Sequence, residues 1–172
     1  RLYMAQYDDD EEIAEEAQLQ WEKKGLALPA SFHIPLFQLL GHSVEKIRRA
    51  AARAIAHGLL EHPEASKAVL DRIEKKCEEV EEIAVPAERA AQKPTILAMF
   101  YCLEQCAAEK AVQVTLLDQL LDQLFDHGFT CSESDVRMQA MHAGESLMEN
   151  YGAECPEEVL TYLNEKLSAL EQ

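Results

Sequence analysis

Apolar residues recur at three- and four-residue intervals along nearly the whole chain, and no segment alternates convincingly between apolar and polar positions. The first spacing places apolar side chains on one face of an α-helix, whereas alternation would indicate a β-strand. The pattern therefore predicts an all-α fold. We expect about eight helices, at residues 9–24, 31–40, 43–61, 63–82, 94–107, 114–126, 134–151 and 156–170.

The predicted ends of the helices carry residues that such ends favour. The acidic run 8–12 suits the positive end of the first helix, and Gly25 ends that helix. Ser43 is expected to cap the third helix. The segment 83–93, which contains one proline and is followed by another, is the longest interruption. We therefore expect a less regular connection there, within a single array of residues 1–172 that is a fragment of a longer chain.

An internal repeat distinguishes an open solenoid from a closed bundle. In the third and seventh helices an aliphatic residue and an arginine are followed by two alanines. The two copies start 89 residues apart, about twice the roughly 40 to 47 residues of one HEAT repeat. A less regular repeat with the helix 94–107 fits between them, so we predict a HEAT-type α-solenoid of antiparallel helix pairs. The repeated positions are Ile47, Arg48, Ala51 and Ala54 in one copy and Val136, Arg137, Ala140 and Ala143 in the other.

The repeated residues have a physical role in such an array. Small alanines three positions apart let neighbouring helices approach closely, while the aliphatic residue reaches into the core. The arginine lies at the edge of that face, where we expect it to bridge to an acid in a neighbouring turn. Glu45 and Asp135 are the acids that the sequence offers for this role.

The charge of the chain excludes some partners. With 32 acidic and 16 basic residues the formal net charge is −16, which disfavours general coating of DNA or RNA. The charge is −6 over residues 1–20, zero over 21–110 and −10 over 111–172, so the middle is balanced. No run approaches the roughly 18 uninterrupted apolar residues of a membrane-spanning helix, and we expect neither a DNA nor a membrane partner.

Residues with catalytic or metal-binding chemistry form no recognisable motif. The five cysteines include no C-x-x-C pair, and Cys102 and Cys106 are expected to be buried, reduced residues rather than ligands. No phosphate-binding loop or H-E-x-x-H sequence occurs, and the histidines near turns have no nucleophile partner. We expect a protein that is not an enzyme and that needs no cofactor or metal.

Four stretches occur along the chain in a recognisable order. They are W-E-K-K-G-L-A-L-P at Trp21 to Pro29, the helix with Ile47-Arg48, S-D-V-R-M-Q-A-M at Ser134 to Met141, and N-Y-G-A-E at Asn150 to Glu154. In this order they resemble the central region of the general control non-derepressible protein one translational activators, near the part similar to the HEAT domain of elongation factor three. The resemblance covers most of the chain and rests on apolar and turn positions.

The resemblance implies a cytoplasmic scaffold that associates with ribosomes. Members of this family help to activate the kinase that phosphorylates the α-subunit of initiation factor two during amino-acid starvation. The kinase-binding surface of the family lies in a later segment, so the resemblance assigns no kinase-contact residue here. An alternative is a HEAT-type adaptor for protein partners only, such as a transport receptor, a phosphatase scaffold or a cytoskeletal factor.

A basic stripe on the third predicted helix is the candidate contact surface. At about 100° per residue, Lys46, Arg49 and Arg53 fall on one side of the helix, away from the alanines, and His57 continues the stripe. One interpretation is a solvated face held by pairs such as Glu45 with Arg49. The other interpretation is contact with ribosomal RNA or with an acidic surface of a ribosomal protein. The sequence leaves both open.

Overall fold

The structure is a computed structural model that describes residues 1–153, 157, 161 and 162. The regular elements in this part of the chain are all helices, which confirms the predicted all-α fold. They are α1 (Leu2–Ala5), α2 (Glu11–Lys23), α3 (His33–Leu39), α4 (Glu45–Glu61), the 3-10 turn η1 (Pro63–Ala65), α5 (Ser66–Glu81), α6 (Pro86–Ala91), α7 (Lys93–Ala108), the 3-10 turn η2 (Val114–Leu116), α8 (Leu117–Gln123), the π-helical η3 (Leu124–Phe129) and α9 (Ser134–Tyr151).

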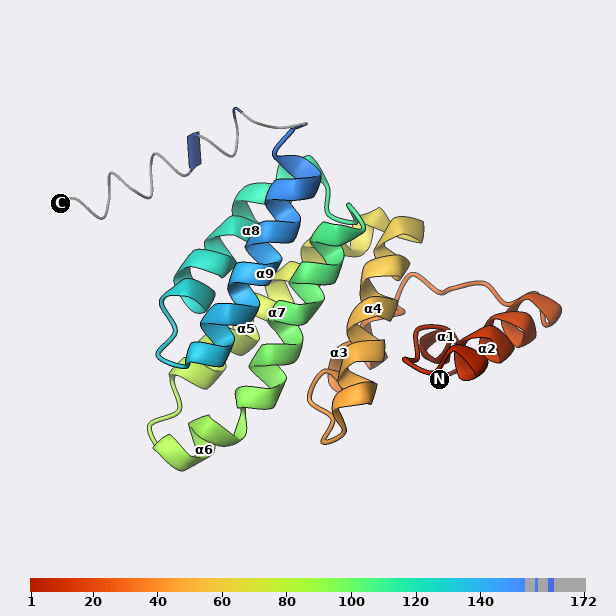
Figure 1. Cartoon of the computed structure of the whole chain (residues 1–172), viewed down its shortest axis with the longest axis horizontal. Helices are drawn as coiled ribbons and strands as arrows, with labels where there is room; N and C mark the ends of the chain where they lie inside the picture. The colour runs from red at the N-terminus through yellow and green to blue at the C-terminus, as the bar shows by residue number, and fades with distance from the viewer. Residues whose placement is uncertain (154–156, 158–160, 163–172) are drawn as a thin grey trace.

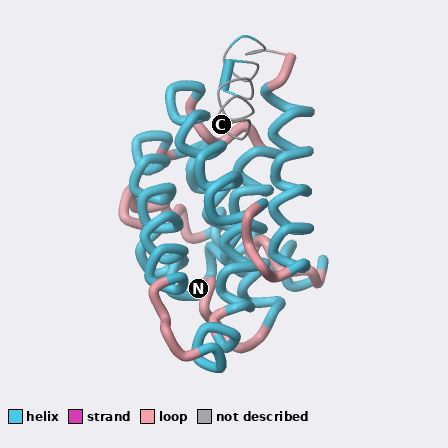
Figure 2. Tube along the Cα trace, turned by 90° about the vertical axis from the view of Figure 1, so that its left-hand side faces the viewer, coloured by secondary structure: helices cyan, strands magenta, loops and turns pink. Residues whose placement is uncertain are grey.

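The helices stack as antiparallel pairs in two layers. Figure 1 shows α4, α7 and α9 side by side in one layer, with α3, α5 and α8 behind them. Figure 2 shows the same two layers from the side. The pairs are therefore α3 with α4, α5 with α7, and α8 with α9. This order confirms the predicted HEAT-type solenoid, including a middle pair between the two copies of the repeat.

The core lies between the two layers and depends on small residues. Ala51, Ala54, Ala140 and Ala143 have no exposed surface. Val136 is buried as expected, but Ile47 is only partly buried and lies outside the core, so the predicted core position of the aliphatic residue is wrong in the first copy. Gly128 in η3 is equally important, because a Cβ atom there would lie 2.6 Å from the Cβ of Ala140 and would also strike a buried ring of α7. Close packing of η3 against α9 therefore requires the absence of a side chain at this position.

The N-terminal residues form a smaller unit against the outer side of α4. Asp10 caps α2, because its side chain accepts hydrogen bonds from the backbone N–H groups of Glu12 and Ile13. Tyr7, just after α1, stacks on His57 of α4 with ring centroids 4.7 Å apart. The short helix α1 was not predicted from the sequence. Polar and aromatic contacts thus attach this unit to the solenoid.

The start of α4 differs from the prediction. The N-cap residue is Val44, and the side chain of Ser43 makes no capping hydrogen bond, so the predicted Ser43 cap is wrong. Instead, Nδ1 of His42 accepts a hydrogen bond of 3.1 Å from the backbone N–H of Val44. The imidazole reaches this backbone group from two residues upstream, a role that the sequence did not distinguish from that of the adjacent hydroxyl.

Three other predicted segments also need comment. The expected irregular connection, 83–93, contains the helix α6, which begins at Pro86. The predicted helix 114–126 is a composite of η2, α8 and the first residues of η3. The predicted helix 156–170 lies outside the described residues apart from isolated positions. Within the described residues, none of the helices combines the length and apolar character needed to cross a membrane.

Candidate functional site

The two repeated arginines have the same structural role. Nη1 of Arg48 donates hydrogen bonds to the carbonyl oxygens of His42 at 2.8 Å and Ser43 at 3.1 Å. Nη1 of Arg137 donates to the carbonyl oxygens of Cys131 at 2.7 Å and Ser132 at 2.8 Å. In both helices the acceptors lie six and five residues before the arginine. We call this arrangement the arginine clasp.

The clasp corrects the expectation that these arginines bridge to acids. Glu45 lies near Arg49 instead, and Asp135 pairs with Lys93. The long side chains of Arg48 and Arg137 fold back over the start of their own helices, where loop carbonyls have no partner in a helical ladder. A charged donor makes strong hydrogen bonds to such carbonyls, so each clasp fixes a loop to its helix.

A third arginine makes a related contact that the sequence analysis missed. Nε and Nη2 of Arg89, in α6, donate to the carbonyl oxygen of Ile83 at 3.0 and 2.6 Å. This carbonyl is again six residues before the arginine. The signal was present as a spacing, because each of the three arginines lies four residues after the N-cap of its helix. The interruption at 83–93 concealed it.

The members of the basic stripe do not share one environment. Arg53 points towards the N-terminal unit and forms an ion pair with Asp9, which holds the pKa of that carboxyl below its usual range. His57 lies 3.7 Å from Glu109 and stacks on Tyr7. On this side of α4 the stripe therefore contacts α1–α2 and α7 as well as solvent.

The other two stripe residues lie at the N-terminal end of α4. Lys46 is exposed in the first turn of the helix. The side chain of Arg49 is 46 % exposed, lies 4.0 Å from Glu45, and places its guanidinium carbon 4.8 Å from the ring centroid of Tyr101. The ring holds the guanidinium in a cation–π contact. Tyr101 belongs to α7, which the stripe pattern could not reveal.

A cleft of about 310 Å³ opens beside this pair, where α4, α7 and α9 come together. Three bases line it, Arg48, Arg49 and Lys93, with Glu45 as the single acid. We call it the α4–α7 cleft. It contrasts with the net charge of −16 for the whole chain. The cleft is therefore a local site at which the basic lining residues outnumber the acidic ones.

Lys93 connects the cleft to the next helix pair. Its Nζ lies 2.6 Å from Asp135 and 3.2 Å from Glu133, at the start of α9. Hydrogen bonds that Lys93 donates to Asp135 and Glu133 raise the pKa of Lys93, and the same contact with Lys93 lowers the pKa of Asp135. Part of the charge of the ammonium group is therefore compensated by the two carboxylates at the start of α9.

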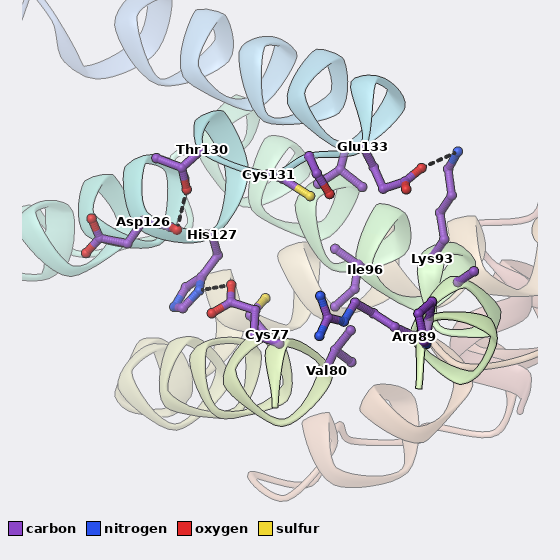
Figure 3. A pocket seen from close by; sticks show the side chains of 15 residues that line it. Cys77, Val80, Arg89, Lys93, Ile96, Asp126, His127, Thr130, Cys131 and Glu133 are labelled. Atoms are coloured by element: carbon purple, nitrogen blue, oxygen red, sulfur yellow. Dashed lines mark hydrogen bonds and ion pairs between the residues drawn. The ribbon is translucent and has the colours of Figure 1, made fainter. Parts of the chain in front are cut away.

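A larger cavity of about 470 Å³ lies on the other side of the middle pair, between α5, α6, η3 and the start of α9 (Figure 3). Two pairs of its ionisable side chains are in contact, because Nδ1 of His127 lies 2.7 Å from Glu81 and Nζ of Lys93 lies 3.2 Å from Glu133. Burial raises the pKa of the Cys77 thiol to about 12, which keeps it protonated. Across the described part of the chain, no three His, Cys, Asp or Glu side chains are arranged to hold a metal ion.

Of the comparisons with known proteins, the one with protein families gives a match, and this match covers the whole chain. Residues 1–172 match a family model described as "Stalled ribosome sensor GCN1, HEAT repeats". No curated protein and no solved structure matches.

Proposed function

This chain belongs to the HEAT-repeat family of the stalled ribosome sensor GCN1, and we propose that it is a non-catalytic scaffold segment of a ribosome-associated translational regulator in the cytoplasm. The family supports ribosome association. The stacked helix pairs support a scaffold, because such arrays present an extended surface to partners. This membership bears out the resemblance carried by the four sequence stretches.

The proposed ribosome contact is the N-terminal end of α4. Lys46 and Arg49 are exposed there, and Arg53 extends the surface on the next turn, where it is shared with Asp9. Ribosomal surfaces are rich in phosphate, which binds Lys and Arg side chains. The observation that carries the proposal is this exposed basic surface. It lies on a chain whose net charge is −16, and the chain belongs to a family of stalled ribosome sensors.

The kinase part of the proposal follows from the family resemblance. In this proposal the segment holds the regulator on the ribosome, and the regulator promotes activation of the starvation-responsive kinase of initiation factor two. The contact with the kinase is made elsewhere in a longer protein. No residue of this chain is assigned to that contact.

Reversing the charge of the surface tests the proposal. In the protein carrying Lys46→Glu and Arg49→Glu, we expect several-fold less co-sedimentation with polysomes at moderate salt, because anionic ribosomal groups are then repelled. A matched control, Lys75→Glu with Lys76→Glu, makes the same change of charge on α5 in the opposite layer. Co-sedimentation equal to that of the unchanged protein would overturn the assignment of this surface.

A further inference from the structure

We propose that the α4–α7 cleft binds a single-stranded segment of ribosomal RNA, with one base stacked on the guanidinium of Arg49 and a flanking phosphate on Lys46. The inference rests on the proposed function and names the chemistry of the partner at the same surface. It depends on the geometry of the Arg49–Tyr101 pair, on the charge of the lining and on the shape of the cleft.

The Arg49–Tyr101 pair places a planar cation on an aromatic ring beside the cleft. The guanidinium carbon lies 4.8 Å from the centre of the Tyr101 ring, within the range of a cation–π contact that holds the guanidinium in place. The Arg49 side chain is nevertheless 46 % exposed. Unpaired bases stack on guanidinium planes and aromatic rings in single-stranded RNA recognition. The pair therefore offers a prearranged stacking surface on the outer side of the guanidinium.

Basic residues line the cleft beside the Arg49–Tyr101 pair, and three acids offset part of their charge, because Glu45 lies near Arg49 and both Asp135 and Glu133 pair with Lys93. Arg48, Arg49 and Lys93 line the cleft, and Lys46 lies one turn before Arg49 near the start of α4. The 17-residue helix α4 and the 16-residue helix α7 both begin at this end of their layer, and their positive N-terminal ends add to the favourable field for an anion. An ammonium group acts as a point charge for phosphate, which suits the exposed Lys46.

The groups that line the cleft favour RNA over an acidic peptide. At about 310 Å³ it lies at the small end of the range for ligand sites and has an apolar wall that includes Leu97. A carboxylate would pair with the edge of the guanidinium and would make no use of the stacked plane. A nucleotide uses the plane through its base and the cations through its phosphates, so it satisfies both features of the site.

The test measures binding of a fluorescein-labelled ten-nucleotide oligouridine to the purified protein by fluorescence anisotropy. Arg49→Lys keeps the charge but removes the plane, and Tyr101→Leu removes the ring beneath it. We expect each change to weaken binding about tenfold, in line with the stacking of one base. The matched control is Arg72→Lys, because Arg72 lies over Phe37 in a second cation–π pair, 5.7 Å from the ring centre, on the opposite layer. That control should bind as the unchanged protein does.

The salt dependence gives a second readout. Lys46→Gln should reduce the slope of log affinity against log salt concentration by about 0.7, the value for one phosphate contact with a single strand. Circular dichroism establishes that each variant is folded, and Arg49→Lys keeps the test valid should Tyr101→Leu fail to fold. Equal affinities of Arg49→Lys and the unchanged protein would overturn the inference.

The possible outcomes distinguish a failure of the RNA inference from a failure of the proposed ribosome contact. A labelled oligoglutamate peptide that binds more tightly than oligouridine would overturn the RNA inference in favour of a protein partner. If charge reversal abolishes polysome co-sedimentation while the stacking variants retain full oligouridine affinity, the ribosome contact stands and the RNA site falls. A third outcome is that Arg49→Lys and Tyr101→Leu lose affinity for oligouridine while the charge-reversed protein still co-sediments with polysomes. In that case the cleft binds RNA, but both the ribosomal origin of that RNA and the proposed ribosome contact are wrong.

Discussion

The starts of α4 and α9 share one framework and present opposite surfaces. Both helices carry the arginine clasp and two fully buried alanines. The neighbouring positions diverge, because Lys46 and Arg49 in α4 correspond to Asp135 and Met138 in α9, 89 residues later. The residues that build the repeat are therefore independent of those that would meet a partner. Binding has to be located repeat by repeat and does not follow from the fold.

The two pairs also achieve close helix packing differently. In the first pair the glycine is on α4 itself, where Gly58 faces the ring of Phe32. In the last pair the glycine is on the partner segment, where Gly128 faces Ala140 of α9. Phe32 is itself only 3 % exposed, and a Cβ atom at Gly58 would lie 2.2 Å from Cε2 of its ring, closer than the 2.6 Å at Gly128. Both pairs therefore exclude a side chain at their glycine.

The largest expected effect comes from Gly128→Ala. The new methyl group would lie 2.6 Å from the Cβ of Ala140, and such overpacking costs about 1 to 3 kcal/mol in the free energy of unfolding. Urea unfolding followed by circular dichroism measures the loss. Gly144→Ala is the control, because its Cβ would lie 3.4 Å from the ring of Phe129. Equal stability of the two variants would contradict the close-packing argument.

Removal of the clasps should have the next largest effect. Arg48→Met and Arg137→Met each delete two hydrogen bonds from a charged donor, and we expect each to lower the free energy of unfolding by about 1 to 2 kcal/mol. Arg49→Met, one residue from the first clasp, should cost less, about 0.5 to 1 kcal/mol, because it removes an exposed cation–π contact with Tyr101 and no clasp. The same unfolding measurement checks all three variants. A loss at Arg48→Met no greater than at Arg49→Met would show that the clasp is not stabilising.

The smallest expected effect concerns a contact that α4 has and α9 lacks. Arg53 pairs with Asp9 of the N-terminal unit, whereas His142, at the corresponding position of α9, lies 3.4 Å from Glu145 on its own helix. Because the Arg53–Asp9 pair is partly exposed, Asp9→Asn should cost about 0.5 to 1 kcal/mol at neutral pH.

The pH dependence of this loss follows from the lowered pKa of Asp9. A carboxyl with a lower pKa in the folded state stabilises the protein fully above its unfolded pKa, and the contribution is lost as the pH falls through the folded pKa. The free energies of unfolding of the unchanged protein and of Asp9→Asn should therefore converge below about pH 4. A difference that persists unchanged into acid would rule out the ion pair as its source.

The apolar spacing and the repeat gave most of the fold. The buried face of α5, with Leu70, Ile73, Cys77 and Val80, is the one that the three- and four-residue intervals indicate. The helix α6 was missed because Pro86 was interpreted as an interruption, although proline is also favoured in the first turn of a helix. A proline alone does not distinguish the end of one element from the start of the next.

The candidate site was only half visible in the sequence. Helical periodicity placed Lys46 and Arg49 on one face of one helix, but Lys93 and Tyr101 come from the less regular middle repeat. Contacts between different helices depend on how the pairs stack, which a pattern within one helix does not contain. The clasp was missed for a related reason, because spacing along a helix does not show that a long side chain folds back onto the preceding loop.

The arginine contacts also bear on how the chain tolerates insertions and deletions. Arg48 and Arg89 are 41 residues apart, and Arg89 and Arg137 are 48 apart, yet each arginine meets a carbonyl six residues upstream. Each helix start is thus aligned by a short local segment and not by the length of the preceding repeat. Residues can be gained or lost in the rest of a repeat while the alignment of the next helix is preserved.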